Sequence, residues 1–84
     1  MNLEILTPER KLYSDDVYGV QLPGIEGSFE ILQHHAPMVS ALKAGTVKVL
    51  VDAHNTTLFE IQSGFVEVLK ENVTILVEGA VAKL

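Results

Sequence analysis

Residues 47–78 decide the fold class, and they read VKVLVDAHNTTLFEIQSGFVEVLKENVTILVE. Apolar side chains recur at every second position in four runs of this stretch: 47–52, 58–62, 65–69 and 73–78. A period of two is typical of a β-strand with one buried face. The inner positions hold mostly valine and isoleucine, which favour the pleated, half-buried surface of a sheet. The stretch therefore predicts four antiparallel strands.

Short polar or glycine-bearing breaks separate the four runs. They are His54-Asn55, Ser63-Gly64 and Glu71-Asn72. Residues of these types favour tight turns. Since the connections are short, each run is expected to pair with the next, which predicts a β-meander across residues 47–78.

The first half of the chain is more broken but has the same character. Five short strands are expected there, at residues 3–5, 11–13, 17–22, 29–31 and 38–42. No stretch shows a helical period, and residues 80–84 are too few for a stable helix. Short strands with frequent turns predict an all-β fold, a flattened sandwich or barrel of mostly antiparallel strands. We expect one domain over residues 1–84.

Composition narrows the range of functions. The 84 residues carry 11 Asp+Glu against six Lys+Arg, which gives a net charge of −5. This balance argues against nucleic acid and against anionic membrane surfaces, because both require basic patches. Cysteine is absent, which excludes a disulfide, a zinc-thiolate site and a cysteine nucleophile. A domain this small buries a limited share of its surface, so a partner is expected to cover part of it.

Candidate catalytic and ligand-binding residues are few. His34 and His35 are adjacent and would point to opposite faces of an extended chain, while His54 lies in a polar turn. No metal site is therefore expected, because structural zinc requires three or four convergent ligands. Ser14 has no histidine nearby, and Ser63 lacks a Gly-x-Ser-x-Gly context. We expect no cofactor, no metal and no enzymatic activity.

A proline and two glycines shape the turn near Glu26. Pro23 fixes φ at about −65° and has no backbone N–H, so a strand is expected to stop there. Gly24 would take the positive φ of a type II turn, and Gly27 would let the chain re-enter a strand. The two glycines do not indicate a phosphate-binding loop, because the lysine and the helix that such a loop requires do not follow them. This geometry would hold Glu26 outward on a stiff frame.

Large apolar side chains also occupy outward-facing positions of the predicted strands. They are Leu50, Leu58, Phe65, Leu69 and Leu76. Single exposed leucines are ordinary, but five large apolar groups on a small domain could form a patch that marks a partner interface. The alternative is that strand edges or N-terminal segments cover some of them. The residues alone leave both interpretations open.

An ordered set of motifs resembles a known family. LPGIEGSF at residues 22–29 and ILQHHAPM at residues 31–38 are similar to the hallmark stretch of the F-type ATP synthase epsilon subunit, called delta in mitochondria. The similarity continues with LKAG at residues 42–45, GFVEV at 64–68 and NVTIL at 72–76. Each motif alone is weak, but the set keeps the family's order and spacing.

The sequence departs from the family pattern at four positions and in length. Glu30, Gln33, His34 and Ala44 stand where the family has Gly, Pro, Gly and Pro, so the loop over residues 30–37 is expected to run differently. Typical members continue into a C-terminal helical hairpin, which carries the family's inhibitory action and, where present, its ATP binding. This sequence resembles a short form without that hairpin, and we expect it to lack both properties.

The resemblance implies a ten-stranded β-sandwich that acts as a non-catalytic rotor subunit. In the family, this domain lies at the foot of the central stalk, contacts the gamma subunit and rests on the polar loops of the membrane c-ring. It thereby couples proton (or sodium) flow to ATP synthesis. The implied location is the cytoplasmic face of the bacterial inner membrane, with membrane association only through the complex.

The resemblance also implies which residues meet each partner. Those matching the family loop at the c-ring are Glu26, Gly27 and Ser28, and those matching the segment near gamma are His35, Ala36, Pro37 and Met38. The outer-face residues expected to add to the gamma interface are Phe65, Leu69 and Leu76. A different class of function also stays open, a stand-alone β-sandwich module that binds a protein or peptide by strand pairing at its edges.

Overall fold

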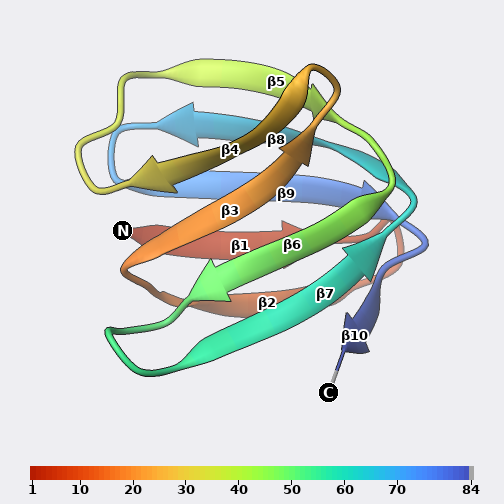
Figure 1. Cartoon of the computed structure of the whole chain (residues 1–84), viewed down its shortest axis with the longest axis horizontal. Coiled ribbons are helices and arrows are strands. Elements are labelled where there is room, and N and C mark those ends of the chain that lie inside the picture. The colour runs from red at the N-terminus through yellow and green to blue at the C-terminus, as the bar shows by residue number, and fades with distance from the viewer. Residues whose placement is uncertain (84) are drawn as a thin grey trace.

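The computed structural model describes residues 1–83, and its regular secondary structure consists of ten β-strands joined by turns (Figure 1). In chain order these are β1 (Asn2–Leu6), β2 (Lys11–Asp16), β3 (Gly19–Gly24), β4 (Gly27–Leu32), β5 (Met38–Leu42), β6 (Gly45–Leu50), β7 (Thr56–Ile61), β8 (Ser63–Leu69), β9 (Asn72–Glu78) and β10 (Val81–Lys83). The predicted all-β class is confirmed.

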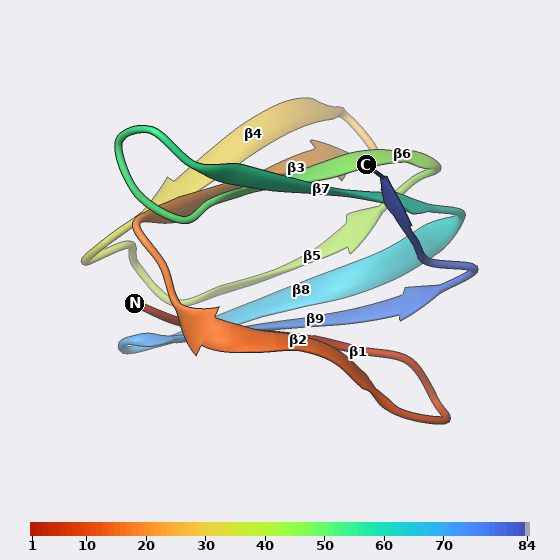
Figure 2. The ribbon, with the colours of Figure 1, turned by 90° about the horizontal axis from the view of Figure 1, so that it is seen from below.

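The strands form one hydrogen-bonded sheet that folds over into two layers (Figure 2). The order is β10-β7-β6-β3-β5-β8-β9-β1-β2, and β4 also pairs with β3. β3 meets β5 only where Gly24 pairs with Leu42, so the sheet turns its corner there. Within residues 1–83, every strand pair is antiparallel except β1 with β9. The predicted sandwich of about ten mostly antiparallel strands is confirmed.

The predicted meander over residues 47–78 is wrong at one connection. β6 and β7 form a hairpin, as do β8 and β9, but β7 does not pair with β8. The chain passes from one layer to the other through Gln62 alone, whose N–H donates to the carbonyl of Glu78. β8 instead lies between β5 and β9. Alternating hydrophobicity identifies the buried face of a strand and does not identify its neighbour.

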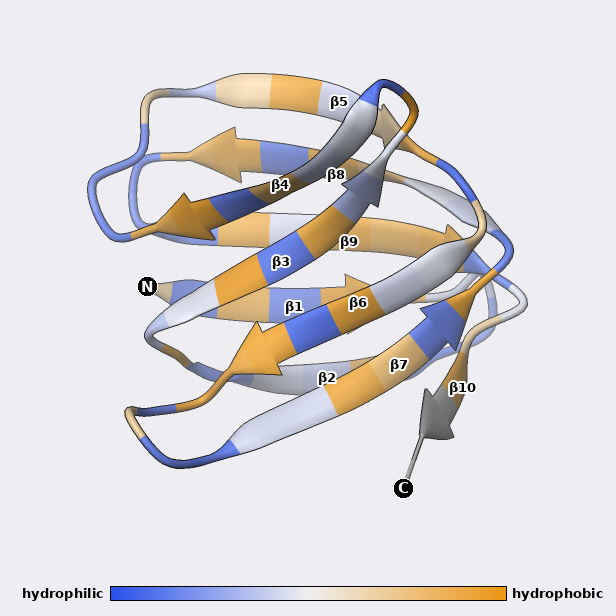
Figure 3. Ribbon diagram, viewed as in Figure 1, coloured by the Kyte–Doolittle hydropathy of each residue, from blue (hydrophilic) through white to orange (hydrophobic). Residues whose placement is uncertain are grey.

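The hydrophobic core lies between the two layers. It contains the inner residues of all four predicted runs, namely Val47, Val49, Phe59, Ile61, Val66, Val68, Val73, Ile75 and Val77. Val51 is only half-buried. Across the described residues no polar or charged side chain is buried, so apolar burial and backbone pairing hold the layers together. Figure 3 shows the resulting alternation of apolar and polar residues along the strands.

The β3–β4 hairpin differs from the predicted turn. β3 continues through Pro23, and Gly24 pairs with Gly27, so the two turn residues are Ile25 and Glu26. Gly27 has a positive φ of 134°, whereas Gly24 does not have a positive φ. The predicted type II turn at Gly24 is therefore wrong. Glycine is needed there for space, because a Cβ would lie 2.6 Å from the carbonyl oxygen of Gly27.

The end of the described chain forms a short strand that the sequence pattern did not reveal. β10 pairs antiparallel with β7, with Val81 opposite Glu60. Residues 80–83 form no helix, as expected, and Leu84 lies outside the described residues.

Candidate partner interface

Apolar side chains, two exposed and two half-buried, form a row across the outer face of the β5-β8-β9-β1 layer. Phe65 on β8 lies opposite Leu76 on β9 and Ala41 on β5. Leu6 of β1 lies beside Leu76. Phe65 is 58% exposed and Leu76 is 53% exposed. These side chains point outward because their strand neighbours face the core.

A groove of about 410 Å³ opens over this row, and we call it the outer-face groove. Its lining residues are Leu6, Thr7, Pro8, Ile25, Ala41, Leu42, Ser63, Gly64, Phe65, Leu76, Val77 and Glu78. Gly64 lets β8 and β9 approach closely, because a Cβ at Gly64 would lie 2.5 Å from the carbonyl oxygen of Leu76. The groove is thus an apolar concavity on a rigid sheet, which suits a bulky apolar side chain of a partner.

The β3–β4 turn forms one wall of the outer-face groove. Ile25 lines the groove and is 60% exposed. Glu26, Gly27 and Ser28 follow Ile25 directly and are exposed. The structure therefore brings the predicted c-ring turn next to Phe65 and Leu76. Ile25 was not identified as a site residue from the sequence. A large apolar residue at the tip of a hairpin turn is exposed and could have indicated a partner contact.

The remaining predicted interface residues lie at the other end of the layer. They are His35, Ala36, Pro37, Met38 and Leu69. Leu69 is four residues from Phe65 on β8, about 13 Å at 3.3 Å per residue. Met38 is half-buried and packs against the core, so it offers less contact surface than expected. The ten predicted residues thus separate into two groups. Residues 26–28, Phe65 and Leu76 lie at the outer-face groove, and residues 35–38 and Leu69 lie at the opposite end of the layer.

Two adjacent histidines lie in the loop before Met38. His35 Nδ1 lies 2.7 Å from the carbonyl oxygen of Ala36, and His34 Nδ1 lies 3.6 Å from Glu71 Oε1 at the β8–β9 turn. His34 has a φ of 64°, a left-handed conformation that glycine adopts more easily. The glycine that the resemblance implies at this position would adopt this φ without strain. Glu30 lies within β4, so that departure does not break the strand.

The five outward-facing apolar residues differ in exposure, and their role as a partner interface stays a prediction. Phe65, Leu69 and Leu76 are more than half exposed, whereas Leu50 and Leu58 are half-buried in the other layer. Other large apolar residues are exposed as well, namely Tyr18, Ile25, Leu32, Val39 and Val81.

Two titratable groups have shifted pKa values, Asp52 in the β6–β7 turn and Tyr13 on β2. Within residues 1–83, no three His, Cys, Asp or Glu residues are placed to hold a metal ion. The side chain of Asn55 and the backbone N–H of His54 donate to Asp52 and lower the pKa of that carboxyl, which is part of a tight turn. Burial raises the pKa of Tyr13, and nearby Asp15 adds to the shift. Along the same residues, no helix has the length and hydropathy needed to cross a membrane.

The family described as "ATP synthase, Delta/Epsilon chain, beta-sandwich domain" matches residues 1–83. The chain belongs to this family. The ATP synthase epsilon chain of Caulobacter vibrioides is 44% identical over 81 residues, which cover 96% of this chain and 93% of that one. The epsilon chain of Campylobacter curvus is 41% identical over 81 residues, and that of Protochlamydia amoebophila is 38% identical over 77. The chain spans 63% and 52% of these two relatives.

Two solved structures contain a chain with the same sandwich fold. A chain in the Euglena gracilis mitochondrial ATP synthase, in its OSCP/F1/c-ring structure, matches with a TM-score of 0.89 and 22% identity, over 95% of this chain and 51% of that one. A chain in the central stalk/c-ring structure of the Tetrahymena thermophila enzyme matches with a TM-score of 0.82 and 19% identity, over 96% and 65%. Because both identities are low, these likenesses establish the fold.

Proposed function

We propose that this chain is a non-catalytic central-stalk subunit of a proton-translocating F-type ATP synthase, which joins the gamma subunit to the c-ring and couples proton flow to ATP synthesis. Family membership over residues 1–83 carries the proposal. In this role the chain lies on the cytoplasmic face of the bacterial inner membrane and is held there through the complex.

A joint of this kind requires stiffness and exposed contact surface. The structure offers both, with the turn around Glu26 adjoining the outer face at the outer-face groove. The core is fully apolar and the two layers are one continuous sheet, so a force applied at one end is carried by backbone hydrogen bonds and packing. We assign the c-ring contact to the exposed turn around Glu26. We assign the gamma contact to the outer face of β5, β8 and β9, from Leu69 to Phe65 and Leu76.

Binding of the gamma subunit tests this assignment. We expect an interface of roughly 1,200–2,000 Å², in which Phe65→Ala, Leu69→Ala and Leu76→Ala each weaken binding while the variants keep the wild-type melting temperature. Leu32→Ala, on the other layer, is the matched control and should bind like the wild type. If all three outer-face variants also bind normally, the assignment of this face is wrong.

Copurification separates the proposal from the alternative of a stand-alone peptide-binding module. A stalk subunit purified from its native cell with a mild detergent should bring gamma and c subunits with it. Recovery of a different protein paired to an exposed strand edge, without gamma, would favour the binding module.

A further inference from the structure

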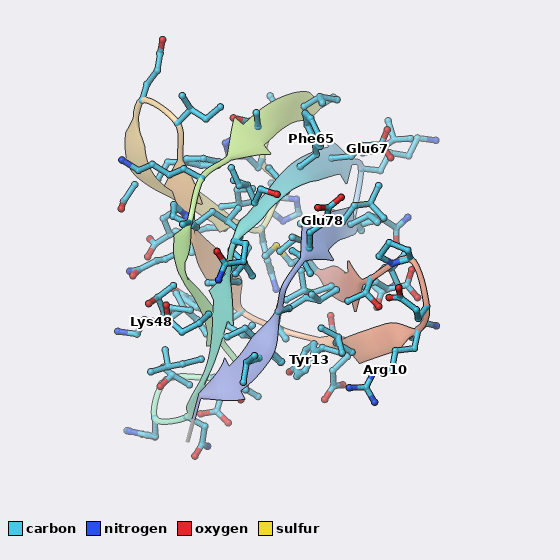
Figure 4. All side chains as sticks on the ribbon, turned by 90° about the vertical axis from the view of Figure 1, so that its right-hand side faces the viewer. Arg10, Tyr13, Lys48, Phe65, Glu67 and Glu78 are labelled. Atoms are coloured by element: carbon cyan, nitrogen blue, oxygen red, sulfur yellow. The ribbon has the colours of Figure 1, made fainter. Side chains whose placement is uncertain are left out.

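Glu67 lies in the middle of the apolar part of the outer face. Its outward-facing neighbours along β8 are Phe65 and Leu69, which are 58% and 55% exposed. Across the strand pairs it lies opposite Val39 of β5, which is 71% exposed, and Thr74 of β9. Figure 4 shows Phe65 and Glu67 projecting from the same side of β8. A partner that covers the three apolar side chains therefore covers Glu67 as well.

The described part of the chain supplies no cation to Glu67. Its ion pairs join other groups, and Glu4 gives the contrast: Lys11 Nζ lies 2.9 Å from Glu4 Oε2. Glu4 is in the same row of the sheet as Glu67, separated from it by Thr74. Removing an unpaired carboxylate from water costs several kcal/mol unless an opposite charge and hydrogen bonds replace the water. The covering partner therefore has to bring the opposite charge.

We propose that the gamma segment that docks here presents an arginine or lysine to Glu67, flanked by bulky apolar side chains that contact Phe65, Leu69 and Val39. This inference rests on the function proposed above and adds the chemistry of the partner. An arginine fits best, since its planar guanidinium binds a carboxylate with two parallel hydrogen bonds and is weakly hydrated. Glu67 then fixes the register of gamma along β8.

A second copy of this chain is a poorer occupant of the same face. In a two-fold dimer the same surface meets itself, so the two Glu67 carboxylates would approach each other without a cation between them. The net charge of −5 adds to this repulsion. The same negative charge disfavours an anionic lipid surface.

The test compares isosteric substitutions in the full chain, with binding to the alpha-beta-gamma assembly measured by biolayer interferometry. Glu67→Gln should raise Kd by at least about 30-fold, mainly through faster dissociation, because a buried cation in gamma loses its partner. Glu67→Lys should abolish binding. Glu30→Gln is the matched control on the other layer and should stay within twofold of the wild type. Because Glu67 is exposed, all three variants should keep the wild-type melting temperature.

The opposite result is equally informative. If gamma has no cation here, Glu67→Gln removes a desolvation cost and should bind as tightly as the wild type or more tightly, which overturns the inference and leaves the proposed function standing. If the wild-type chain does not bind the assembly at all, both fail. A dimer detected by light scattering and removed by Phe65→Ala would assign the face to a second copy and also overturn the inference.

Discussion

Replacement of Gly24 by alanine tests the packing of the β3–β4 hairpin. A Cβ at this position would lie 2.6 Å from the carbonyl oxygen of Gly27 and 2.7 Å from Cε1 of Phe29. The oxygen is backbone in a paired strand, so the hairpin has to open to admit the methyl group. Overpacking of this kind costs about 1–3 kcal/mol, and alanine returns roughly 0.4–1 kcal/mol by restricting the unfolded chain. The difference spans roughly 0–2.6 kcal/mol, and we expect a loss near its middle, about 1–2 kcal/mol, in the free energy of unfolding.

Thermal and urea unfolding followed by circular dichroism measure this loss. For a domain of this size, 1 kcal/mol shifts Tm by about 4–8 °C, so Tm should fall by about 4–16 °C. Ser28→Ala changes an exposed position of the same hairpin and should stay within about 0.5 kcal/mol of the wild type. A Gly24→Ala protein that unfolds at the same temperature as Ser28→Ala would refute the steric argument.

Three further perturbations follow from the turns. His34→Gly should raise the free energy of unfolding by up to about 1 kcal/mol. A non-glycine residue in the left-handed conformation costs roughly 1–2 kcal/mol, and glycine removes this cost but makes the unfolded chain more flexible, which offsets part of the gain. A variant that is less stable in urea unfolding would contradict this. The pKa of Asp52 is lowered in the folded chain, so its carboxylate stabilises the fold above the unfolded value of 3.8 and this stabilisation is lost as the pH falls through the folded pKa. The Tm difference between the wild type and Asp52→Ala should therefore be larger at pH 7 than at pH 3, and an equal difference at both would argue against it. Glu26→Gln should keep the wild-type Tm and slow association with c-ring preparations, most clearly at low salt; a salt-independent rate would remove the turn from the c-ring contact.

The sequence predicted buried faces better than strand neighbours. Val66 and Ile75 lie in the core as their alternation indicated, because a period of two reports the side of a strand that faces away from water. The alternation does not show that the chain changes layer at Gln62, between β7 and β8, where the predicted strand pairing was wrong. Val17 is buried outside any strand, with its N–H donated to the carbonyl of Met1, so the expected strand over residues 17–22 begins two residues later.

The exposure of interface residues could be predicted where it depends only on which side of its own strand a residue lies. Phe65 and Leu76 are outward-facing positions of regular strands, and both are exposed. Leu50 also faces outward on its strand but is half-buried. Its burial depends on neighbouring parts of the fold, which the alternation of apolar and polar residues within one strand cannot identify. For the same reason the outer-face groove was not predicted, because it requires Ile25 from the far corner of the sheet to meet β8 and β9.

The parallel pairing of β1 with β9 sets the order in which a growing chain can fold. Leu3 pairs with Val73, so β1 cannot complete its pairing until β9 has been synthesised. At about 5–20 residues per second, the 70 residues from Glu4 to Val73 take roughly 4–14 s to synthesise. During that time β1 can pair with β2, but Leu3 and Ile5, both fully buried in the finished domain, lack the cover that β9 provides. We therefore expect this small domain to close its sheet in one late step, once β9 has left the ribosome.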